Sequence, residues 1–329
     1  MRFGPVAVDQ AAGAVLAHSV EIAGKKLRKG RVLDPDDLAL MQGAGVAEII
    51  VARLDPGDLD ENAAAALIAL AMVPDAAAAH LRLTKASTGR VNIYADMPGV
   101  LQLDVEKIEA ANRVDPMVTI ATLPPFARTR ARGMVATVKI IAYGVADQAA
   151  AKAAELARDA MRVRPVQIKD AVLIQTDIGA GPGKGEEAMR GRLDALGITL
   201  RPVQTVPHKA EPLAKAVATA EAGLVLILTA SATSDAHDVA PEAVRAAGGQ
   251  VTRFGMPVDP GNLLFLGTQG GRPVIGLPGC ARSPALNGAD WVLERVVCGL
   301  DVSDSDIAAM GVGGLLKESP ARPFPREQS

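Results

Sequence analysis

Apolar and polar positions follow two different periods in the second half of the chain. From residue 169 onward, short runs of consecutive apolar residues, such as 224–228 (LVLIL), are separated by longer amphipathic runs. The apolar runs are typical of strands buried on both faces, and the amphipathic runs of helices. We predict strands at 171–176, 198–206, 224–230, 250–256, 263–268 and 272–279, and helices at 186–197, 211–223, 241–249 and 283–299. This order favours an α/β fold with three layers around a mostly parallel sheet.

The first 168 residues mix shorter strands and helices. Residues 34–45 should form a helix that begins after Asp34 and ends near Gly43 or Gly45. Alternation over 88–104 predicts a hairpin with its turn at Pro98-Gly99. The other predicted strands are 12–18, 48–51 and 134–142, and the other predicted helices are 62–73 and 149–161.

These patterns predict a division of the chain into four parts. Smaller α+β units are expected at 1–76 and 77–168, and the α/β domain at 169–302. Residues 303–329, rich in glycine and proline toward their end, have the composition of a linker. The basic run Lys25–Arg31 suits the exposed edge of a hairpin, with binding of an anionic ligand as the alternative.

Composition narrows the class of protein. The formal net charge is -2, so no global basic field attracts nucleic acid. The two cysteines, Cys280 and Cys298, do not form a CxxC pair, which argues against a structural zinc site or a disulfide framework. The N-terminus lacks the pattern of a signal peptide, and no apolar run has the length of a membrane span. We therefore expect a cytoplasmic protein with no membrane partner.

Ligands of open α/β sheets bind beyond the carboxyl ends of the strands, so the loops at those ends are the candidate site. The first loop, 175–185, is rich in glycine and contains Thr176 and Lys184, a composition suited to a phosphate. It is not a P-loop, because no serine or threonine follows the lysine. The second loop, 229–238, gathers hydroxyls and carboxylates; its candidate residues are Thr229, Ser231, Thr233, Ser234, Asp235 and Asp238. Asp238 is also the expected N-cap of the next helix, and His237 is expected at the surface.

The third and fourth loops add a turn and a basic residue. The third, 257–262, carries a turn signal and includes Gly261 and Asn262. The fourth, 276–284, should lead into the last helix with Ser283 as N-cap and Pro284 at the first helical position. Arg282 beside that N-terminus suits an anion. Gly279 and Cys280 complete this loop, and Cys280 is expected to be packed rather than nucleophilic.

The order and spacing of these loops resemble the molybdopterin-binding domain shared by molybdopterin adenylyltransferases, molybdate-insertion enzymes and gephyrin. The resemblance runs from about Val172 to Gly299. Thr229–Asp238 is similar to the family's threonine-rich loop that ends in an aspartate, Pro260-Gly261 to its Pro-Gly-Lys-Pro turn, and residues 276–279 (GLPG) to its Gly-Leu-Pro-Gly signature, with Ser283 near the signature's serine. Residues 11–20 and 27–51 also resemble the N-terminal portion of molybdate-insertion enzymes.

Three further segments resemble bacterial fusions in which such a region precedes a cytidylyltransferase-type nucleotidyltransferase. They are 254–264 (FGMPVDPGNLL), 278–284 (PGCARSP) and 310–318 (MGVGGLLKE). The chain is similar to the first half of these fusions. The resemblance implies a nucleotidyltransferase domain or a molybdoenzyme as partner, and a homo-oligomer.

Four departures from the family pattern favour binding over catalysis. Ala230 and Ser231 replace paired glycines, Asn262 replaces a lysine, Cys280 replaces an asparagine, and Asp235 replaces a glycine. The leading hypothesis is a molybdopterin-binding protein of molybdenum-cofactor biosynthesis that holds the cofactor phosphate at these loops.

Asp238 and Asp235 are its candidate catalytic residues, and Asp238 is the candidate metal ligand. If the protein is an enzyme, it is a transferase that inserts molybdate or transfers a nucleotidyl group, with Mg²⁺, molybdate, ATP or CTP as co-reactants. Two alternatives are a non-catalytic scaffold that delivers the cofactor to the partner domain, and a diverged α/β protein that binds another small ligand.

Overall fold

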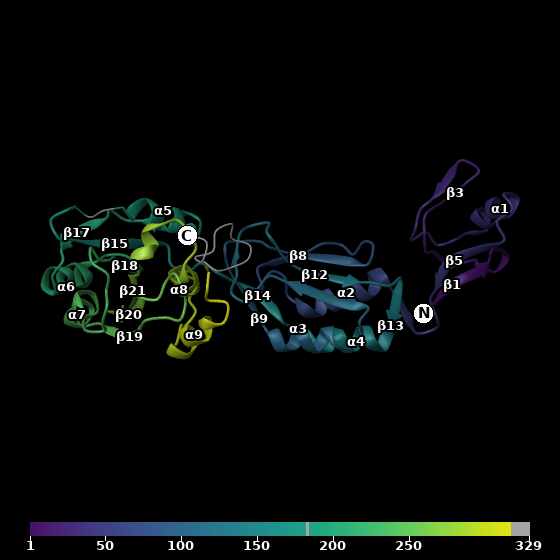
Figure 1. Cartoon of the computed structure of the whole chain (residues 1–329). Helices are drawn as coiled ribbons and strands as arrows, with labels where there is room; N and C mark the ends of the chain where they lie inside the picture. The colour runs from purple at the N-terminus through teal and green to yellow at the C-terminus, as the bar shows by residue number, and fades with distance from the viewer. Residues whose placement is uncertain (182–183, 317–329) are drawn as a thin grey trace. The chain divides into compact units, whose positions relative to one another are not determined.

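The computed structural model describes residues 1–181 and 184–316, and the chain divides into two compact units (Figure 1). Unit 1 comprises residues 1–97 and 101–163, and unit 2 comprises 98–100 and the chain from 164 onward. No helix in the described ranges is long and apolar enough to span a membrane. The four-part division drawn from the sequence stays a prediction.

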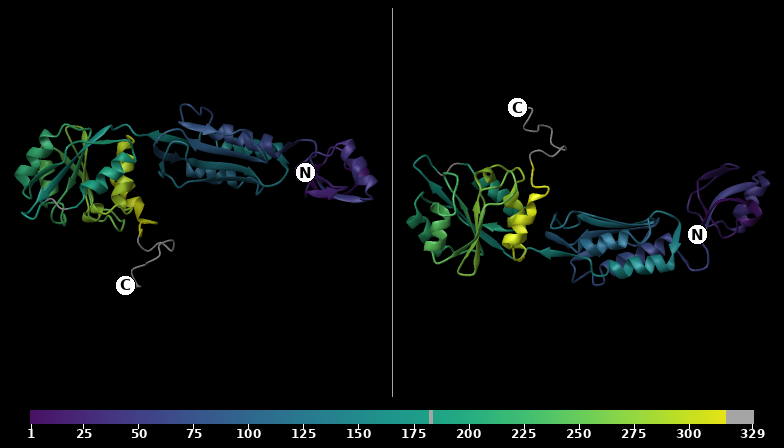
Figure 2. Two further views of the ribbon diagram at one scale, coloured as in Figure 1. Left: turned by 90° about the horizontal axis from the view of Figure 1, so that it is seen from above. Right: turned by 60° about the horizontal axis from the view of Figure 1, so that its bottom comes forward.

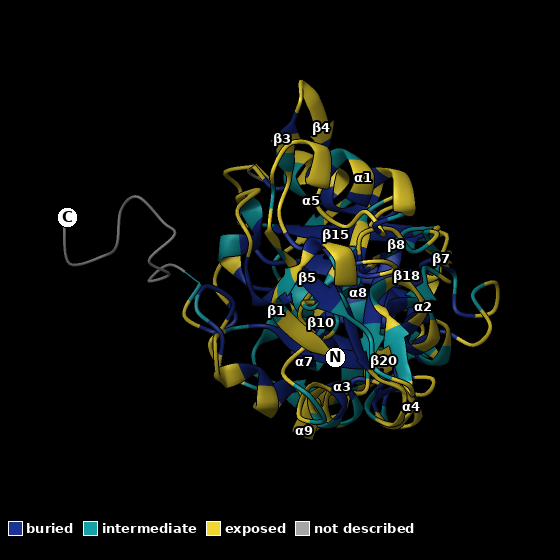
Figure 3. Cartoon of the chain, turned by 90° about the vertical axis from the view of Figure 1, so that its right-hand side faces the viewer, coloured by how far each residue is buried: buried dark blue, intermediate teal, exposed yellow. Residues whose placement is uncertain are grey.

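Unit 1 begins with a small sheet in the order β1-β5-β2 and a hairpin of β3 and β4. Helix α1 has the predicted N-cap, Asp34, whose side chain accepts from the Asp37 backbone in a capping box. Lys25 and Lys26 lie exposed in β4, which confirms the hairpin edge (Figure 3). These elements are β1 (Arg2–Ala7), β2 (Val15–Leu16), β3 (Val20–Ile22), β4 (Lys25–Leu27), α1 (Pro35–Gly43) and β5 (Glu48–Arg53), with a 3-10 turn at Val8–Gln10. The sequence missed β1.

The rest of unit 1 packs helices against a sheet in the order β10-β12-β8-β7. Alanines on one side of α2, among them Ala64 and Ala65, let the helix approach this sheet closely, and Ile68 fills the core between them. The elements are β6 (Asp58–Asp60), α2 (Glu61–Met72), β7 (Leu81–Leu83), β8 (Arg90–Ala95), β9 (Gly99–Leu103), α3 (Val105–Asn112), β10 (Val118–Thr122), β11 (Arg128–Thr129), β12 (Met134–Ile140), β13 (Gly144–Ala146), α4 (Asp147–Leu156) and β14 (Met161–Pro165). The strand predicted at 134–142 and the helices at 62–73 and 149–161 are confirmed.

The hairpin predicted over 88–104 is wrong. Strand β8 pairs with β12 and β7, whereas β9 lies between β11 and β14 in a different sheet. The chain leaves β8 at Asp96, whose N–H donates to the His80 carbonyl, and Leu101 in β9 bonds with Ala127 instead. Partners distant in sequence therefore compete successfully with the local turn signal at Pro98-Gly99.

Unit 2 is the predicted α/β fold, built on a seven-stranded sheet in the order β16-β15-β18-β21-β20-β19, with β17 also paired to β15. The pairs of β15 with β16, β17 and β18, and of β18 with β21, are parallel, while β20 is antiparallel to β21 and β19. The strands are β15 (Asp170–Asp177), β16 (Thr199–Leu200), β17 (Gln204–Pro207), β18 (Leu224–Leu228), β19 (Gln250–Phe254), β20 (Phe265–Gln269) and β21 (Arg272–Leu277). Because β19 runs the same way as β21, all four predicted loops lie at one edge, the carboxyl edge of the parallel strands.

Helices cover both faces of this sheet (Figure 1 and Figure 2). Helices α6 and α7 pack on the face formed by Val172, Ile174, Val225 and Ile227, where Leu213 and Val244 complete the core. Helices α5 and α8 lie on the other face. The helices are α5 (Glu186–Asp194), α6 (Ala210–Thr219), α7 (Val239–Ala246), α8 (Gly288–Val297) and α9 (Asp304–Ala308), with 3-10 turns η2 (Gly279–Arg282) and η3 (Ala309–Gly311).

Three predictions in unit 2 need correction. The single strand expected at 198–206 is two short strands, because Pro202 lacks an N–H and interrupts the pairing with β15. The last helix begins at Gly288 with Asn287 as N-cap, so Ser283 ends the turn η2 instead of capping a helix. Within the predicted linker 303–329, residues 304–311 form α9 and η3 because Ile307 and Met310 are buried. Residues 317–329 of that segment lie outside the described residues.

We predict that Gly276→Ala destabilises the protein by about 1–3 kcal/mol. Gly276 lies opposite Phe265 in the β20–β21 pair, and a Cβ at this position would lie 1.9 Å from Cε1 of that ring. Denaturant unfolding measures the change. Gly191→Ala is the control, because an added Cβ there meets nothing within 4 Å and helix propensity favours alanine. Equal losses in the two variants would contradict this packing.

Candidate functional site

The last residues of β15 bring two polar side chains to the carboxyl edge on opposite faces of the sheet. Side chains alternate along a strand, and Val172 and Ile174 face α6 and α7. Thr176 therefore faces the same side, and Gln175 faces α5. Both side chains are buried, Gln175 being 2% exposed and Thr176 0%.

Thr176 joins the first loop to the second. Its Oγ1 accepts a hydrogen bond from the Ala230 N–H at 2.8 Å and lies 2.9 Å from Nδ1 of His208. The tautomer of His208 decides which of the two groups donates in this contact. Sequence reasoning missed His208. The signal that points to it is its position directly after β17, at the same strand-end edge as the other candidates.

Arg282 links the first, second and fourth loops. Its Nη1 donates to the carbonyl of Lys184 and its Nη2 to the carbonyl of Thr229, each at 2.8 Å. Two planar donors on one guanidinium fix the separation of these two carbonyls. The predicted residues Thr176, Lys184, Thr229 and Arg282 are thus brought together.

A second arginine, Arg192 of α5, holds the fourth loop in place from the buried side. Its Nε donates to Asp290 Oδ1 at 2.5 Å, and its Nη1 donates to the carbonyls of Ala188 at 3.3 Å and Ala281 at 3.0 Å. Its Nη2 donates to the carbonyls of Ser283 at 2.8 Å and Ala285 at 3.1 Å. All five N–H donors of this buried guanidinium are used, so residues 281–285 are fixed against α5 and α8.

Asp238 caps α7 as predicted and also closes the second loop. Its Oδ1 accepts from the Val239 N–H at 2.7 Å and its Oδ2 from the Ser234 N–H at 2.9 Å. The Ser234 hydrogen bond is the main cause of a lowered pKa of Asp238; burial opposes it, and the Val239 hydrogen bond and nearby His208 lower the pKa further. The carboxylate is held ionised as part of the loop framework.

The other predicted residues of the second loop lie around this framework. Thr233 is buried, with its Oγ1 3.4 Å from that of Thr229. Ser231, Ser234 and Asp235 are exposed, and Asp235 accepts from the His237 N–H at 2.8 Å. His237 itself is exposed and lies 3.0 Å from Glu242, which fits the surface position expected for it.

The third loop is not joined to the other three by these bonds. Gly261 lies against the start of α8, where the Gly288 N–H donates to the Pro260 carbonyl, and Asn262 is exposed. In the fourth loop, Gly279 and Ser283 are exposed and Cys280 is half-buried. Neither cysteine forms a disulfide.

A magnesium site at Asp238 stays a prediction. Within 1–181 and 184–316, no group of three or more histidine, cysteine, aspartate or glutamate side chains has an arrangement that could hold a metal ion.

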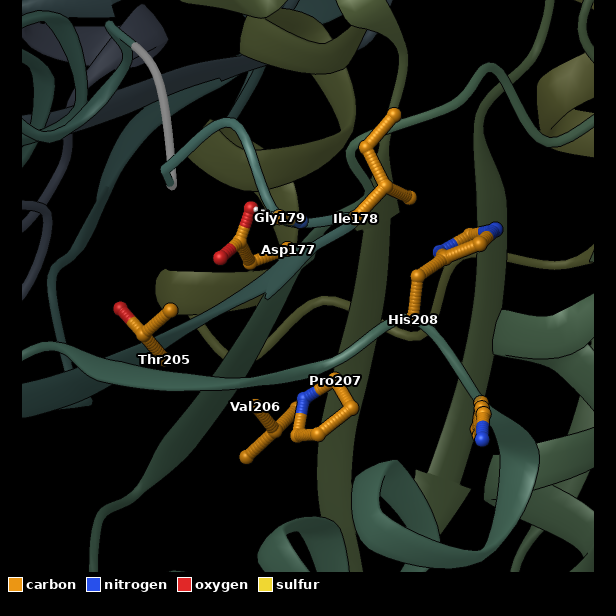
Figure 4. A pocket seen from close by; sticks show the side chains of 8 residues that line it. Asp177, Ile178, Gly179, Thr205, Val206, Pro207 and His208 are labelled. Atoms are coloured by element: carbon orange, nitrogen blue, oxygen red, sulfur yellow. Dashed lines mark hydrogen bonds between the residues drawn. The ribbon is translucent and has the colours of Figure 1, made fainter.

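A pocket of about 580 Å³ opens beside the Thr176–His208 contact (Figure 4). Its wall is apolar at Ile178, Val206 and Pro207 and polar at Asp177 and Thr205. Gly179, His208 and Lys209 complete the lining. This volume lies within the range of small-ligand sites.

The region that contains these loops is similar to a known domain family. Residues 179–296 match the family model of a probable molybdopterin binding domain. Residues 5–53 match a domain of unknown function. A comparison with curated proteins gave no match.

Solved structures of molybdenum-cofactor proteins also align with the chain, with low scores. A molybdopterin biosynthesis MoeA protein from Pyrococcus horikosii is 11% identical over 91% of this chain and 75% of its own, with a TM-score of 0.32. MogA is 17% identical over 42% of this chain and 97% of its own, with a TM-score of 0.27. A molybdenum cofactor biosynthesis protein from Pyrococcus furiosus is 12% identical over 92% and 66%, with a TM-score of 0.25. TM-scores this low support no argument, so the likeness to a molybdopterin-binding domain rests on the family match of residues 179–296.

We predict that Arg192→Leu lowers the free energy of unfolding by about 3–5 kcal/mol, because it leaves Asp290 buried without its cation. Denaturant unfolding measures this loss. Arg190→Leu, two residues away, is the control: its pair with Glu186 is exposed and should contribute less than about 1 kcal/mol. A loss in Arg192→Leu no larger than in the control would refute the organising role of Arg192.

We also predict a pH-dependent stability difference between the wild type and Asp238→Asn. Asparagine has one acceptor oxygen, so it can still cap α7 but cannot accept from both Val239 and Ser234, and we expect a loss of about 1 kcal/mol. Because the folded pKa of Asp238 is lowered from 3.8, the wild-type advantage is complete above that value and disappears as the pH falls through the folded pKa. Thermal unfolding between pH 2 and 7 tests this, and a difference that is constant over the range would contradict it.

Proposed function

We propose that unit 2 binds molybdopterin and acts in molybdenum-cofactor biosynthesis, with the phosphate of the ligand at the carboxyl edge of the sheet. One observation carries the proposal. Residues 179–296 match the molybdopterin-binding family, and within this range Arg282 joins the first, second and fourth loops by hydrogen bonds. The family match comes from the sequence, and the hydrogen bonds that join the loops come from the structure, so the two support the proposal independently.

The loop chemistry suits a phosphate. The N-cap of helix α5 is Gly185, which has no side chain to cap it, so the first backbone N–H groups of the helix are available to an anion. Lys184 is exposed directly before this helix, and Arg282 lies beside it. We propose that Lys184 and the helix start bind the phosphate, and that Arg282 and Thr176 hold the loops around it.

The neighbouring pocket has the lining expected for the remainder of the ligand. Ile178, Val206 and Pro207 provide apolar surface for a flat ring system, and Asp177 and Lys209 provide polar groups at its edge. We propose that the pterin lies here.

Binding is a better supported role than catalysis. Both carboxylate oxygens of Asp238 already accept backbone hydrogen bonds, which supports a structural role for this residue. Nucleotidyl transfer or molybdate insertion, with Asp235 and Asp238 as catalytic groups, stays a prediction, as do delivery to a partner domain and assembly into an oligomer.

Anaerobic titration calorimetry with molybdopterin tests the proposal. We expect the wild type to bind and Lys184→Gln to bind about 5–10-fold more weakly, because one charge–phosphate contact is lost. Lys215→Gln, an exposed lysine on α6, is the matched control and should bind like the wild type. Absence of binding by the folded wild type would refute the proposed function. Consumption of ATP or CTP with Mg²⁺ in a parallel assay would support the transferase alternative.

A further inference from the structure

Gln175 is a buried polar side chain whose hydrogen-bonding capacity is incompletely used. It is 2% exposed, and its Nε2 has no hydrogen-bond partner among the described residues. A buried donor without an acceptor is destabilising, and most buried polar groups in proteins are paired. Some group outside the described protein atoms is therefore expected to accept from it.

The surroundings of this side chain indicate where that acceptor lies. Gln175 faces the α5 side of the sheet, and its Nε2 is 3.3 Å from the position that a Cβ on Gly185 would occupy. Arg282 Cγ and Leu228 Cδ2 are 3.5 and 2.5 Å from the same point. The carboxamide donor therefore lies close to Gly185, the N-cap of α5, a helix that begins without a side-chain cap.

The charges around this point are mixed but favour an anion at the helix start. Lys184 and Arg282 supply positive charge. Glu186 and Glu187 in the first turn are both exposed, and Glu186 pairs with Arg190 at 2.7 Å. On the buried side, the amide donor of Gln175 lies near Gly185, the residue from which the first backbone N–H groups of α5 follow. Such groups bind an oxyanion well.

We infer that Gln175 Nε2 donates a hydrogen bond to an oxyanion bound at the N-terminus of α5, and that Gln175 is a positioning and specificity residue of this subsite. The ligand class is a phosphate or phosphate monoester; its identity as the phosphate of molybdopterin rests on the proposed function. The side chain is already buried in the ligand-free protein, so packing holds its amide in one place. It therefore favours a ligand that has an acceptor oxygen at that position.

The inference predicts opposite effects on stability and on binding. Gln175→Met keeps the volume and removes the donor, so the ligand-free protein should melt at a higher temperature because no buried donor is left without an acceptor. The same change should weaken binding of the anion by roughly 10- to 100-fold, the usual loss for a hydrogen bond to a charged group. A residue with a purely structural role would not show this combination.

Two measurements on the full chain test the inference. Titration calorimetry measures the binding of inorganic phosphate, pyrophosphate and molybdopterin, and thermal unfolding measures the stability of the ligand-free protein. Gln175→Glu is a second variant, which replaces the donor by a carboxylate and should weaken anion binding further. Gln250→Met is the matched control at an exposed position and should change neither quantity.

The possible results separate the two proposals. Equal affinities of the wild type and Gln175→Met for molybdopterin would overturn the inference and leave the proposed function intact. Phosphate binding that depends on Gln175, without binding of molybdopterin, would support the inference and refute the proposed function. A Gln175→Met protein that is less stable than the wild type would show that Nε2 already has a partner, which would overturn the inference.

Discussion

The buried pair of Arg192 and Asp290 is the interaction on which the carboxyl edge of unit 2 depends. It connects α5 to α8, two helices far apart in sequence that cover the same face of the sheet. The remaining donors of Arg192 bind carbonyls of residues 281–285, so the fourth loop cannot move without leaving a guanidinium or a carboxylate buried and unpaired. Arg282 lies within that fixed segment, and its hydrogen bonds to the carbonyls of Lys184 and Thr229 set the first and second loops relative to it.

Strand β15 divides the edge into two halves by the simple alternation of its side chains. On one face, Thr176 contacts His208, a residue that lines the pocket. On the other, Gln175 Nε2 lies near the start of α5. In the proposed function, the phosphate of the ligand lies at the start of α5 and its ring system lies in the pocket beside His208.

Several residues that the sequence suggests as ligands serve mainly to hold the loops. Asp238 and Thr176 use their oxygens on backbone N–H groups, and Arg282 uses two donors on carbonyls. Such contacts prepare a binding edge in advance, which lowers the cost of ordering it when a ligand binds. In the proposals made above, the groups that contact the ligand are the helix start, Lys184 and the Gln175 amide.

The sequence by itself determined the α/β class, most strand and helix positions in unit 2, and the loops at the carboxyl edge. Those features follow from local periodicity, from caps such as Asp34 and Asp238, and from the rule that ligands meet parallel sheets at one edge. Only the tertiary structure decided that β8 and β9 belong to different sheets, that Arg192 binds the fourth loop, that His208 lies against Thr176, and that the Nε2 of Gln175 is buried without a partner among the described residues. These depend on partners tens of residues away, and neither hydrophobic period nor turn chemistry records which distant carbonyl or carboxylate a side chain will meet.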